Sequence, residues 1–203
     1  MNSIIIGTKN IAKINQIKGA LAPSGISVDG LPVNTKINDV LEDGKTAQEN
    51  AQKKALHYSL FLDKPVLSMD NALYFDNLEP NQQPGINVRR INKKNERPTD
   101  EELIDHYQKL ISKLGDRITG RWEYAICVAY PDGSIKETTI ISPRIFVSNK
   151  SEIVVLGYPL ESFQIDPESE KRLSDMTQKE QDIFWQKTIG TPLNEFIKNL
   201  KDW

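Results

Sequence analysis

The hydrophobic pattern at the start of the chain predicts a strand followed closely by a helix. Three consecutive isoleucines at residues 4–6 form a β-branched run that ends at a Gly-Thr pair, as in a buried strand before a turn. From Asn10, the expected N-cap, apolar side chains recur at the spacing of a helix face, at Ile14, Ile17, Ala20 and Leu21. A strand, a short loop and a helix make the first unit of an α/β fold.

A second helix is predicted next, and a short strand follows it. Thr46 and Glu49 have the spacing of a capping box at a helix N-terminus. Beyond them, small and apolar side chains recur at steps of three or four residues, beside a polar row formed by Thr46, Asn50 and Lys54. Residues 65–67 then begin a strand that ends near Asp70.

The rest of the sequence predicts further helices and strands, without an internal repeat or a flexible linker. Residues 77–98, rich in Asn, Gln, Pro and basic residues, are expected to form a long loop. The other predicted elements are a helix from Thr99 to about Leu114, strands at 119–130 and 134–146 joined by a Pro-Asp-Gly turn, a short strand at 153–156, and helices at 177–187 and 192–201. We therefore expect a single α/β domain over residues 1–203.

Composition narrows the classes of function. The 203 residues carry a formal net charge of −2, whereas a protein that neutralises nucleic-acid phosphates is usually clearly basic. Cys127 is the one cysteine, which excludes an internal disulfide and a four-cysteine zinc site, and its apolar surroundings predict a buried strand residue. His57 and His106 fall in helical patterns without a partner at metal-ligand spacing, which argues against zinc chemistry.

No segment has the pattern of a targeting or membrane-spanning sequence. The N-terminal residues lack the basic segment and long apolar stretch of a signal peptide. No apolar run approaches the roughly 18 to 20 residues that a membrane span requires. We therefore expect a cytoplasmic protein whose partners include neither a membrane nor polymeric nucleic acid.

Three short segments carry polar residues suited to a phosphate-bearing ligand and a metal ion. In Thr8-x-Asn10-x-x-Lys13, a strand leads into a helix N-terminus, whose N–H groups and partial positive charge favour phosphate. Glu42 precedes the predicted second helix, and Mg²⁺ takes few protein carboxylates together with phosphate oxygens. Asp70, expected at the carboxyl end of a strand, could hold metal or accept a proton from water.

Each of these segments also has a purely structural interpretation. The first could be an ordinary helix cap beside a surface lysine. The second could be a capped amphipathic helix with a solvated polar face, and for Glu49 this capping role is the favoured one. Asp70 could be a turn aspartate. Only the combination of the three segments favours function over structure.

Together the three segments resemble the inosine triphosphate pyrophosphatase family, also called the non-canonical purine NTP pyrophosphatases. The resemblance is strong over about residues 3–92 and weaker afterwards. The T-x-N-x-x-K motif of the family is matched by Thr8, Asn10 and Lys13, and its E-x-G-x-T-x-x-E-N-A-x-x-K-A segment by residues 42–55. Its D-D-S-G-L motif corresponds to Met69 to Leu73. The P-G pair and the arginine that follow this motif correspond to Pro84-Gly85 and Arg90.

The resemblance implies an elongated α/β fold, a mixed sheet in two lobes flanked by helices, usually dimeric, with the nucleotide in a cleft between the lobes. It implies Mg²⁺-dependent hydrolysis of (deoxy)nucleoside triphosphates, in particular those with non-canonical purines, in which pyrophosphate leaves the α-phosphorus. Glu42 and Asp70 would hold Mg²⁺, and Asp70 and Lys13 would act in catalysis. The substrate-binding residues would be Thr8, Asn10, Lys13, Lys54, Arg90, Tyr158, Trp185 and Lys187.

The sequence departs from the family pattern at the metal and base motifs. Met69 replaces the first aspartate of a pair, which could weaken metal binding or change its geometry. The base-recognition loop G-F-G-Y-D-P is reduced to residues 157–161, and Trp-Gln-Lys at 185–187 stands where the family has S-H-R. Tyr158 or Trp185 could stack on a base, and Glu161 could replace the loop aspartate. For Trp185 the alternative is packing in the core.

Three functions stay open on the sequence alone. The intact phosphate and metal residues favour a pyrophosphatase with altered base preference. The loss of an aspartate at Met69 and the changed base motifs favour a nucleotide-binding regulatory protein without turnover. The third is a phosphatase that acts on another phosphate bond.

Overall fold

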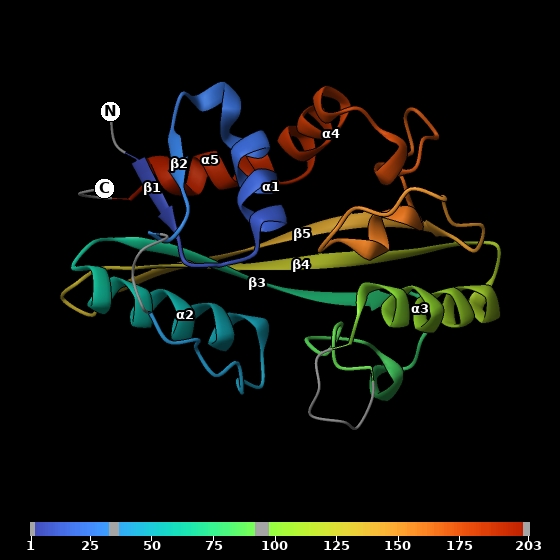
Figure 1. Cartoon of the computed structure of the whole chain (residues 1–203), viewed down its shortest axis with the longest axis horizontal. Helices are drawn as coiled ribbons and strands as arrows, with labels where there is room; N and C mark the ends of the chain where they lie inside the picture. The colour runs from blue at the N-terminus through green and yellow to red at the C-terminus, as the bar shows by residue number, and fades with distance from the viewer. Residues whose placement is uncertain (1–2, 33–36, 92–97, 201–203) are drawn as a thin grey trace. The chain divides into compact units, whose positions relative to one another are not determined.

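The computed structural model describes residues 3–32, 37–91 and 98–200 and has an α/β fold built on one sheet (Figure 1). The strand order in the sheet is β2-β1-β3-β4-β5-β6. The strands are β1 Ser3–Ile6, β2 Ser27–Asp29, β3 Val66–Phe75, β4 Arg117–Ala129, β5 Ile135–Val147 and β6 Gln164–Ile165. The α-helices are α1 Ile11–Leu21, α2 Ala47–Leu62, α3 Asp100–Leu114, α4 Gln178–Trp185 and α5 Thr191–Lys198.

The sheet is mixed, as predicted. Strand β1 runs parallel to both β2 and β3, whereas β5 and β6 are antiparallel. Strands β4 and β5 are joined by the predicted hairpin, in which the Gly133 N–H donates to the Tyr130 carbonyl at 2.9 Å. Gly133 has a φ of 83°, a conformation that favours glycine at this turn.

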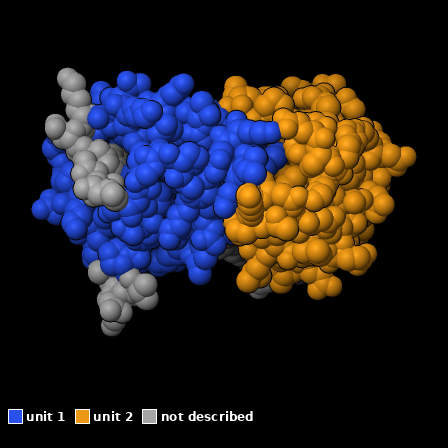
Figure 2. All heavy atoms as spheres, turned by 90° about the horizontal axis from the view of Figure 1, so that it is seen from above, with its two compact units in different colours: residues 1–71, 123–140, 182–203 blue, residues 72–122, 141–181 orange. Residues whose placement is uncertain are grey.

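The chain divides into two compact units, coloured separately in Figure 2. Unit 1 comprises residues 1–71, 123–140 and 182–203, and unit 2 comprises residues 72–122 and 141–181. The expectation of a single domain over residues 1–203 stays a prediction, as do the two-lobed shape and the nucleotide cleft between lobes.

Unit 1 holds the N-terminal strands together with helices α1, α2 and α5. Figure 1 shows α1 and α5 on one side of the long strands and α2 on the other side. Helix α1 packs closely on the π-helical turn η5 (Gln186–Gly190). Glycine at position 190 permits this approach, since a Cβ there would lie only 2.3 Å from the Ala20 carbonyl oxygen. The buried side chains of this unit include Ile4, Ile6, Ile17, Leu21, Val66, Leu67 and Cys127.

Unit 2 has its own hydrophobic core around helix α3. The helix begins with the predicted capping box, in which Thr99 and Glu102 each accept the other's backbone N–H. On its buried face, the Tyr107 hydroxyl donates to the Val88 carbonyl at 2.9 Å. The core side chains include Leu73, Phe75, Leu103, Tyr107, Ile111, Phe146 and Phe163.

Several predicted boundaries need correction. The strand expected to end near Asp70 continues to Phe75, because residues 72–75 are mostly apolar and Leu73 and Phe75 pack in the core of unit 2. The predicted strand at 153–156 is wrong: among the described residues this segment makes only an isolated bridge between Val155 and Tyr158. Its apolar side chains had suggested a strand, yet Leu156 is 87% exposed. The sequence reading missed β2 and β6, which are two or three residues long.

Three further expectations concern the loop at 77–98, membrane-spanning helices and Cys127. Part of the predicted loop at 77–98 forms the short 3₁₀ helix η2 (Pro80–Gln82), and residues 92–97 lie outside the described residues. None of the helices in the described part of the chain has the length and apolar character to cross a membrane. Cys127 is confirmed as a buried strand residue of β4, and burial raises the pKa of its thiol to about 12.

Unit 2 also buries a carboxyl group, that of Glu161 in the 3₁₀ helix η3 (Pro159–Ser162). The residue is 4% exposed, and its Oε2 accepts no hydrogen bond from the described residues. Arg144, equally buried on β5, donates to Ser142 Oγ and to the Pro143 carbonyl. Burial raises the pKa of Glu161 to about 8, while the positive charge of Arg144 acts in the opposite direction.

The protonation of Glu161 predicts a pH-dependent stability. Because its folded pKa of about 8 exceeds the ordinary value of 4.5, the folded protein keeps a proton that the unfolded chain releases. The stability that this proton provides is full below the ordinary pKa and is lost as pH rises through about 8. The variant Glu161→Gln should remove this decline, which amounts to at most about 1.4 kcal/mol per pH unit.

Urea unfolding at pH values from about 5 to 9 measures the effect. Wild type should lose stability relative to Glu161→Gln as pH rises, with no further divergence well above pH 8. The matched control is Glu152→Gln, an exposed carboxyl of the same unit, which should follow wild type. Parallel pH profiles for wild type and Glu161→Gln would show that the carboxyl does not titrate in this range.

Candidate active site

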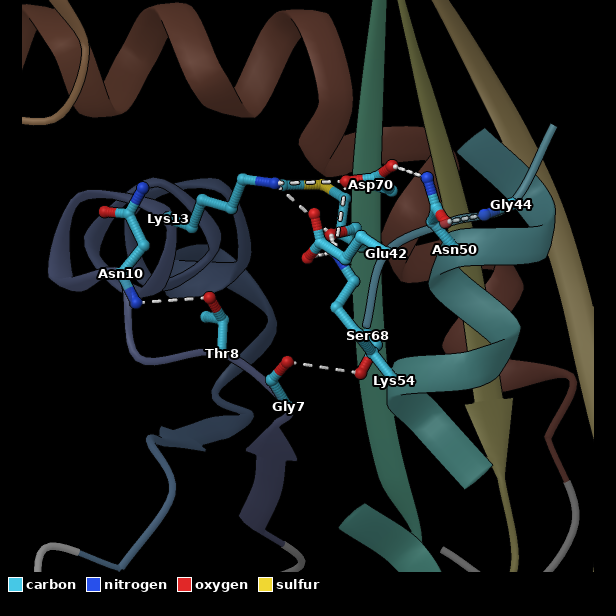
Figure 3. Close-up of polar contacts among 11 residues, drawn as sticks. Gly7, Thr8, Asn10, Lys13, Glu42, Gly44, Asn50, Lys54, Ser68 and Asp70 are labelled. Carbon is cyan, nitrogen blue, oxygen red and sulfur yellow. Dashed lines mark hydrogen bonds and ion pairs between the residues drawn. The ribbon is translucent and has the colours of Figure 1, made fainter. Parts of the chain in front are cut away.

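The end of strand β1 lies directly against strand β3. The Gly7 N–H donates to the Leu67 carbonyl at 2.7 Å, and Ser68 Oγ donates to the Gly7 carbonyl at 3.3 Å. A Cβ on Gly7 would lie 2.2 Å from Ser68 Oγ, so glycine permits this close approach. The contact places the loop after β1 beside the stretch of β3 that carries Asp70 (Figure 3).

The loop after β1 forms the N-terminus of helix α1. Asn10 is the N-cap, as predicted, and its Oδ1 accepts the Ala12 N–H at 3.0 Å. Thr8 Oγ1 accepts the Asn10 N–H at 3.1 Å. Both side chains therefore order the start of α1, and Lys13 projects from the first turn of this helix. That Thr8 and Asn10 bind phosphate stays a prediction.

The loop that carries Glu42 is attached to the first turn of helix α2. Thr46 is the N-cap and accepts the Glu49 N–H at 3.1 Å. Glu49 accepts the Lys45 N–H at 2.6 Å, one residue earlier than in the usual capping box. The capping box predicted for Thr46 and Glu49 is thus half formed, and the Glu49 carboxylate orders the helix start through Lys45 instead of Thr46.

Asn50 joins this loop to the middle of strand β3, a role that was not predicted from the sequence. Its Oδ1 accepts the Gly44 N–H at 2.8 Å, and its Nδ2 donates to Asp70 Oδ2 at 3.2 Å. Asn50 is 2% exposed, so both contacts are shielded from water. The signal in the sequence was the polar row of Thr46, Asn50 and Lys54, which places three polar side chains on one face of α2.

Lys54 makes the central contacts of the site. Its Nζ lies 3.0 Å from Glu42 Oε1, 3.0 Å from Asp70 Oδ1 and 3.1 Å from the Met69 carbonyl oxygen. Lys13 reaches the same place from α1, with its Nζ 3.3 Å from the Met69 carbonyl and 3.9 Å from Asp70 Oδ1. Figure 3 shows these side chains pointing toward one another from α1, α2, β3 and the loop before α2.

The structure therefore brings together two carboxylates and two ammonium groups that are far apart in the sequence. Within the described ranges, no cluster of three or more His, Cys, Asp or Glu residues could hold a metal ion. Met69, where the family has an aspartate, brings no side-chain carboxylate, and only its backbone carbonyl accepts hydrogen bonds from the two lysines. The remaining donors, Glu42 and Asp70, fit Mg²⁺, which commonly takes one or two carboxylates together with phosphate oxygens and water.

The other predicted site residues are placed differently. Arg90 and Tyr158 belong to unit 2, where Arg90 is exposed and Tyr158 is half-buried before η3. Lys187 is exposed in η5. Trp185 is 6% exposed and packs edge-on against Phe184, with ring centroids 5.0 Å apart. The burial of Trp185 favours the packing interpretation over stacking on a base.

Comparison with known proteins places this arrangement in a family. The sequence profile of the Ham1 family matches residues 4–184, which is most of the chain. The chain belongs to the Ham1 family. This confirms the resemblance to the inosine triphosphate pyrophosphatases, and it extends the match beyond the N-terminal half, where the motifs were clearest.

Relatives of this Ham1 chain match it at low identity. A dITP/XTP pyrophosphatase of Rhodopirellula baltica is 26% identical over 180 residues, covering 87% of this chain and 83% of that protein. A dITP/XTP pyrophosphatase of Halalkalibacterium halodurans is 27% identical over 184 residues, covering 89% of this chain and 90% of that protein.

Solved structures confirm the fold. A HAM1 protein from Coxiella burnetii superposes with a TM-score of 0.72 at 18% identity, covering 98% of this chain and all of that chain. The Ham1 protein of Staphylococcus aureus gives a TM-score of 0.69 at 25% identity, with the same coverage. The mixed six-stranded α/β architecture is therefore that of the family.

The bridging position of Asn50 predicts the cost of removing it. The variant Asn50→Ala removes the amide that the Gly44 N–H and Asp70 Oδ2 contact in a shielded environment, so the free energy of unfolding should fall by about 1–3 kcal/mol. Urea denaturation measures this difference. Lys53→Ala, an exposed position of the same helix, is the control and should change stability by less than about 0.5 kcal/mol. Equal stability of Asn50→Ala and wild type would refute the bridge.

Proposed function

We propose that this protein hydrolyses (deoxy)nucleoside triphosphates, and in particular non-canonical purine NTPs, to the monophosphate and pyrophosphate. The observation that carries the proposal is the convergence of Lys13 and Lys54 with Glu42 and Asp70 at one place. The names of the two relatives, both dITP/XTP pyrophosphatases, support the same reaction.

The two lysines would bind the triphosphate. Lys13 extends from the first turn of α1, where the helix N-terminus adds partial positive charge, and Lys54 extends from α2. Ammonium groups held against the phosphates stabilise the negative charge that develops on the leaving pyrophosphate. Thr8 and Asn10 order the turn between β1 and α1 and would contribute hydrogen bonds to phosphate oxygens.

Asp70 and Glu42 would hold Mg²⁺, which when bound neutralises phosphate charge and orients the phosphate chain. Asp70 would also accept the proton of the attacking water. The water oxygen bonds to the α-phosphorus, the bond between this phosphorus and the bridging oxygen breaks, and that oxygen leaves with pyrophosphate. The Asn50 contact to Asp70 Oδ2 holds the carboxylate in place, so that its other oxygen faces the lysines.

A second set of residues is proposed to recognise the base and ribose. We propose that Arg90, Tyr158 and Lys187 contact the base or ribose, whereas the buried Trp185 would support the site by packing. The departures at residues 157–161 and 185–187 favour an altered base preference. A homodimer in the cytoplasm remains the expected state of the protein.

A second candidate function is nucleotide binding without turnover. It is favoured by Met69, because the described residues at this place offer two carboxylates rather than three. A regulatory protein would keep the phosphate-binding lysines and lose the metal geometry that catalysis needs.

A substrate panel separates these functions. The protein is incubated with Mg²⁺ and a set of NTPs and dNTPs that includes ITP, dITP and XTP, and pyrophosphate, monophosphate and orthophosphate are measured. We expect pyrophosphate and monophosphate in equal amounts. Binding without product would favour the regulatory protein, and orthophosphate in place of pyrophosphate would favour a different phosphatase.

The role of Asp70 predicts a separation of binding from turnover. The variant Asp70→Asn keeps the shape of the side chain and removes its charge and proton-accepting ability, so turnover should fall at least about a hundredfold. Nucleotide binding, measured by calorimetry, should stay within a few-fold of wild type. Asp63→Asn, at the exposed C-terminal end of α2, serves as the control. Near-normal turnover in Asp70→Asn would show that Asp70 has only a structural role.

A further inference from the structure

The ammonium group of Lys54 fills the place where the two carboxylates converge. It donates hydrogen bonds to Asp70 Oδ1 at 3.0 Å and to the Met69 carbonyl oxygen at 3.1 Å, and it forms an ion pair with Glu42 Oε1 at 3.0 Å. An ammonium has three N–H donors, so these two hydrogen bonds leave one N–H, and the Glu42 carboxylate lies within ion-pair distance of the same nitrogen. A phosphate oxygen that approaches this ammonium group therefore competes with Glu42 for it.

The charges at this place already balance. Lys54 and Lys13 together match the charges of Glu42 and Asp70. A divalent cation added alone would meet two ammonium groups close to its carboxylate ligands, which repel it. A triphosphate carries several negative charges and offers both lysines new partners. The cluster is therefore arranged so that a metal ion is better accommodated when phosphates are present.

The contact to Glu42 is the one that can be released most easily. The Glu42 side chain is 42% exposed, whereas those of Asp70 and Lys54 are 12% and 9% exposed. Ion pairs that water reaches are screened and contribute little stability, while shielded ones are costly to break. Separation of Lys54 from Glu42 makes the ammonium group accessible to a phosphate oxygen and the Glu42 carboxylate available to a metal ion in the same movement.

We propose that the Lys54 ammonium group occupies the metal position between Glu42 and Asp70 in the nucleotide-free protein. When substrate binds, this group moves to the phosphates and leaves the position to the metal ion. The inference rests on the proposed function and adds a regulation of the same site. The free protein then binds divalent cations weakly, and metal and nucleotide strengthen each other's binding by the same factor. A metal ion is thereby kept from the carboxylates until a triphosphate is in place.

A titration of the nucleotide-free protein with Mn²⁺, followed by the electron paramagnetic resonance signal of the free ion, tests the proposal. The variant Lys54→Met vacates the position between the carboxylates, and it should bind Mn²⁺ at least about tenfold more tightly than wild type. Lys13→Met removes an equal charge near Asp70 and leaves Lys54 in place, so its gain should be clearly smaller. Lys53→Met, which removes an exposed ion pair to Asp43, should equal wild type.

The titration distinguishes failure of this inference from failure of the proposed function. It contains no nucleotide, whereas the function is tested by pyrophosphate release from wild type. Lys54→Gln is a second variant, and thermal unfolding shows which of the two is folded. If a folded variant binds Mn²⁺ no more tightly than wild type, or no more tightly than Lys13→Met, Lys54 does not compete with the metal and the inference is overturned.

Discussion

The ion pairs of one ammonium group organise the site. Lys54 is held at 3.0 Å by a carboxylate from a loop and by another from strand β3, which brings Glu42 and Asp70 together although the chain separates them by a whole helix. Because two nearby carboxylates repel each other, the cation between them stabilises this arrangement. Under the proposed function, substrate and metal ion bind by changing this balance of charges.

Two glycines next to these charged groups permit close contacts that a larger residue would prevent. Gly7 lets β1 approach Ser68 of β3, where a Cβ would lie 2.2 Å from the Ser68 hydroxyl oxygen. Gly44 has the same function on the other side, where a Cβ would lie 2.6 Å from Asn50 Oδ1. Two glycines and one buried amide therefore help to set the positions of the charged groups.

Much of the fold and part of the site could be predicted from the sequence. Periodic segments with capping residues, such as α1 after Asn10 and α3 after Thr99, are specified locally, and so is the hairpin before Ser134. Whether a short segment forms a strand depends on its pairing partners, which local pattern does not reveal. For this reason residues 153–156 were wrongly predicted as a strand, and the short strands β2 and β6 were not predicted. The bridge made by Asn50 escaped notice for the same reason, since it joins groups distant in sequence.

The most direct measurement of the central claim is a crystal structure with Mg²⁺ and a dITP analogue whose α,β-bridging oxygen is replaced by a methylene group. The account predicts that Glu42 and Asp70 face the metal ion, while the ammonium groups of Lys13 and Lys54 contact phosphate oxygens. Phosphates bound elsewhere on the protein, with Lys54 still paired to Glu42 and Asp70 in the same crystal, would contradict it.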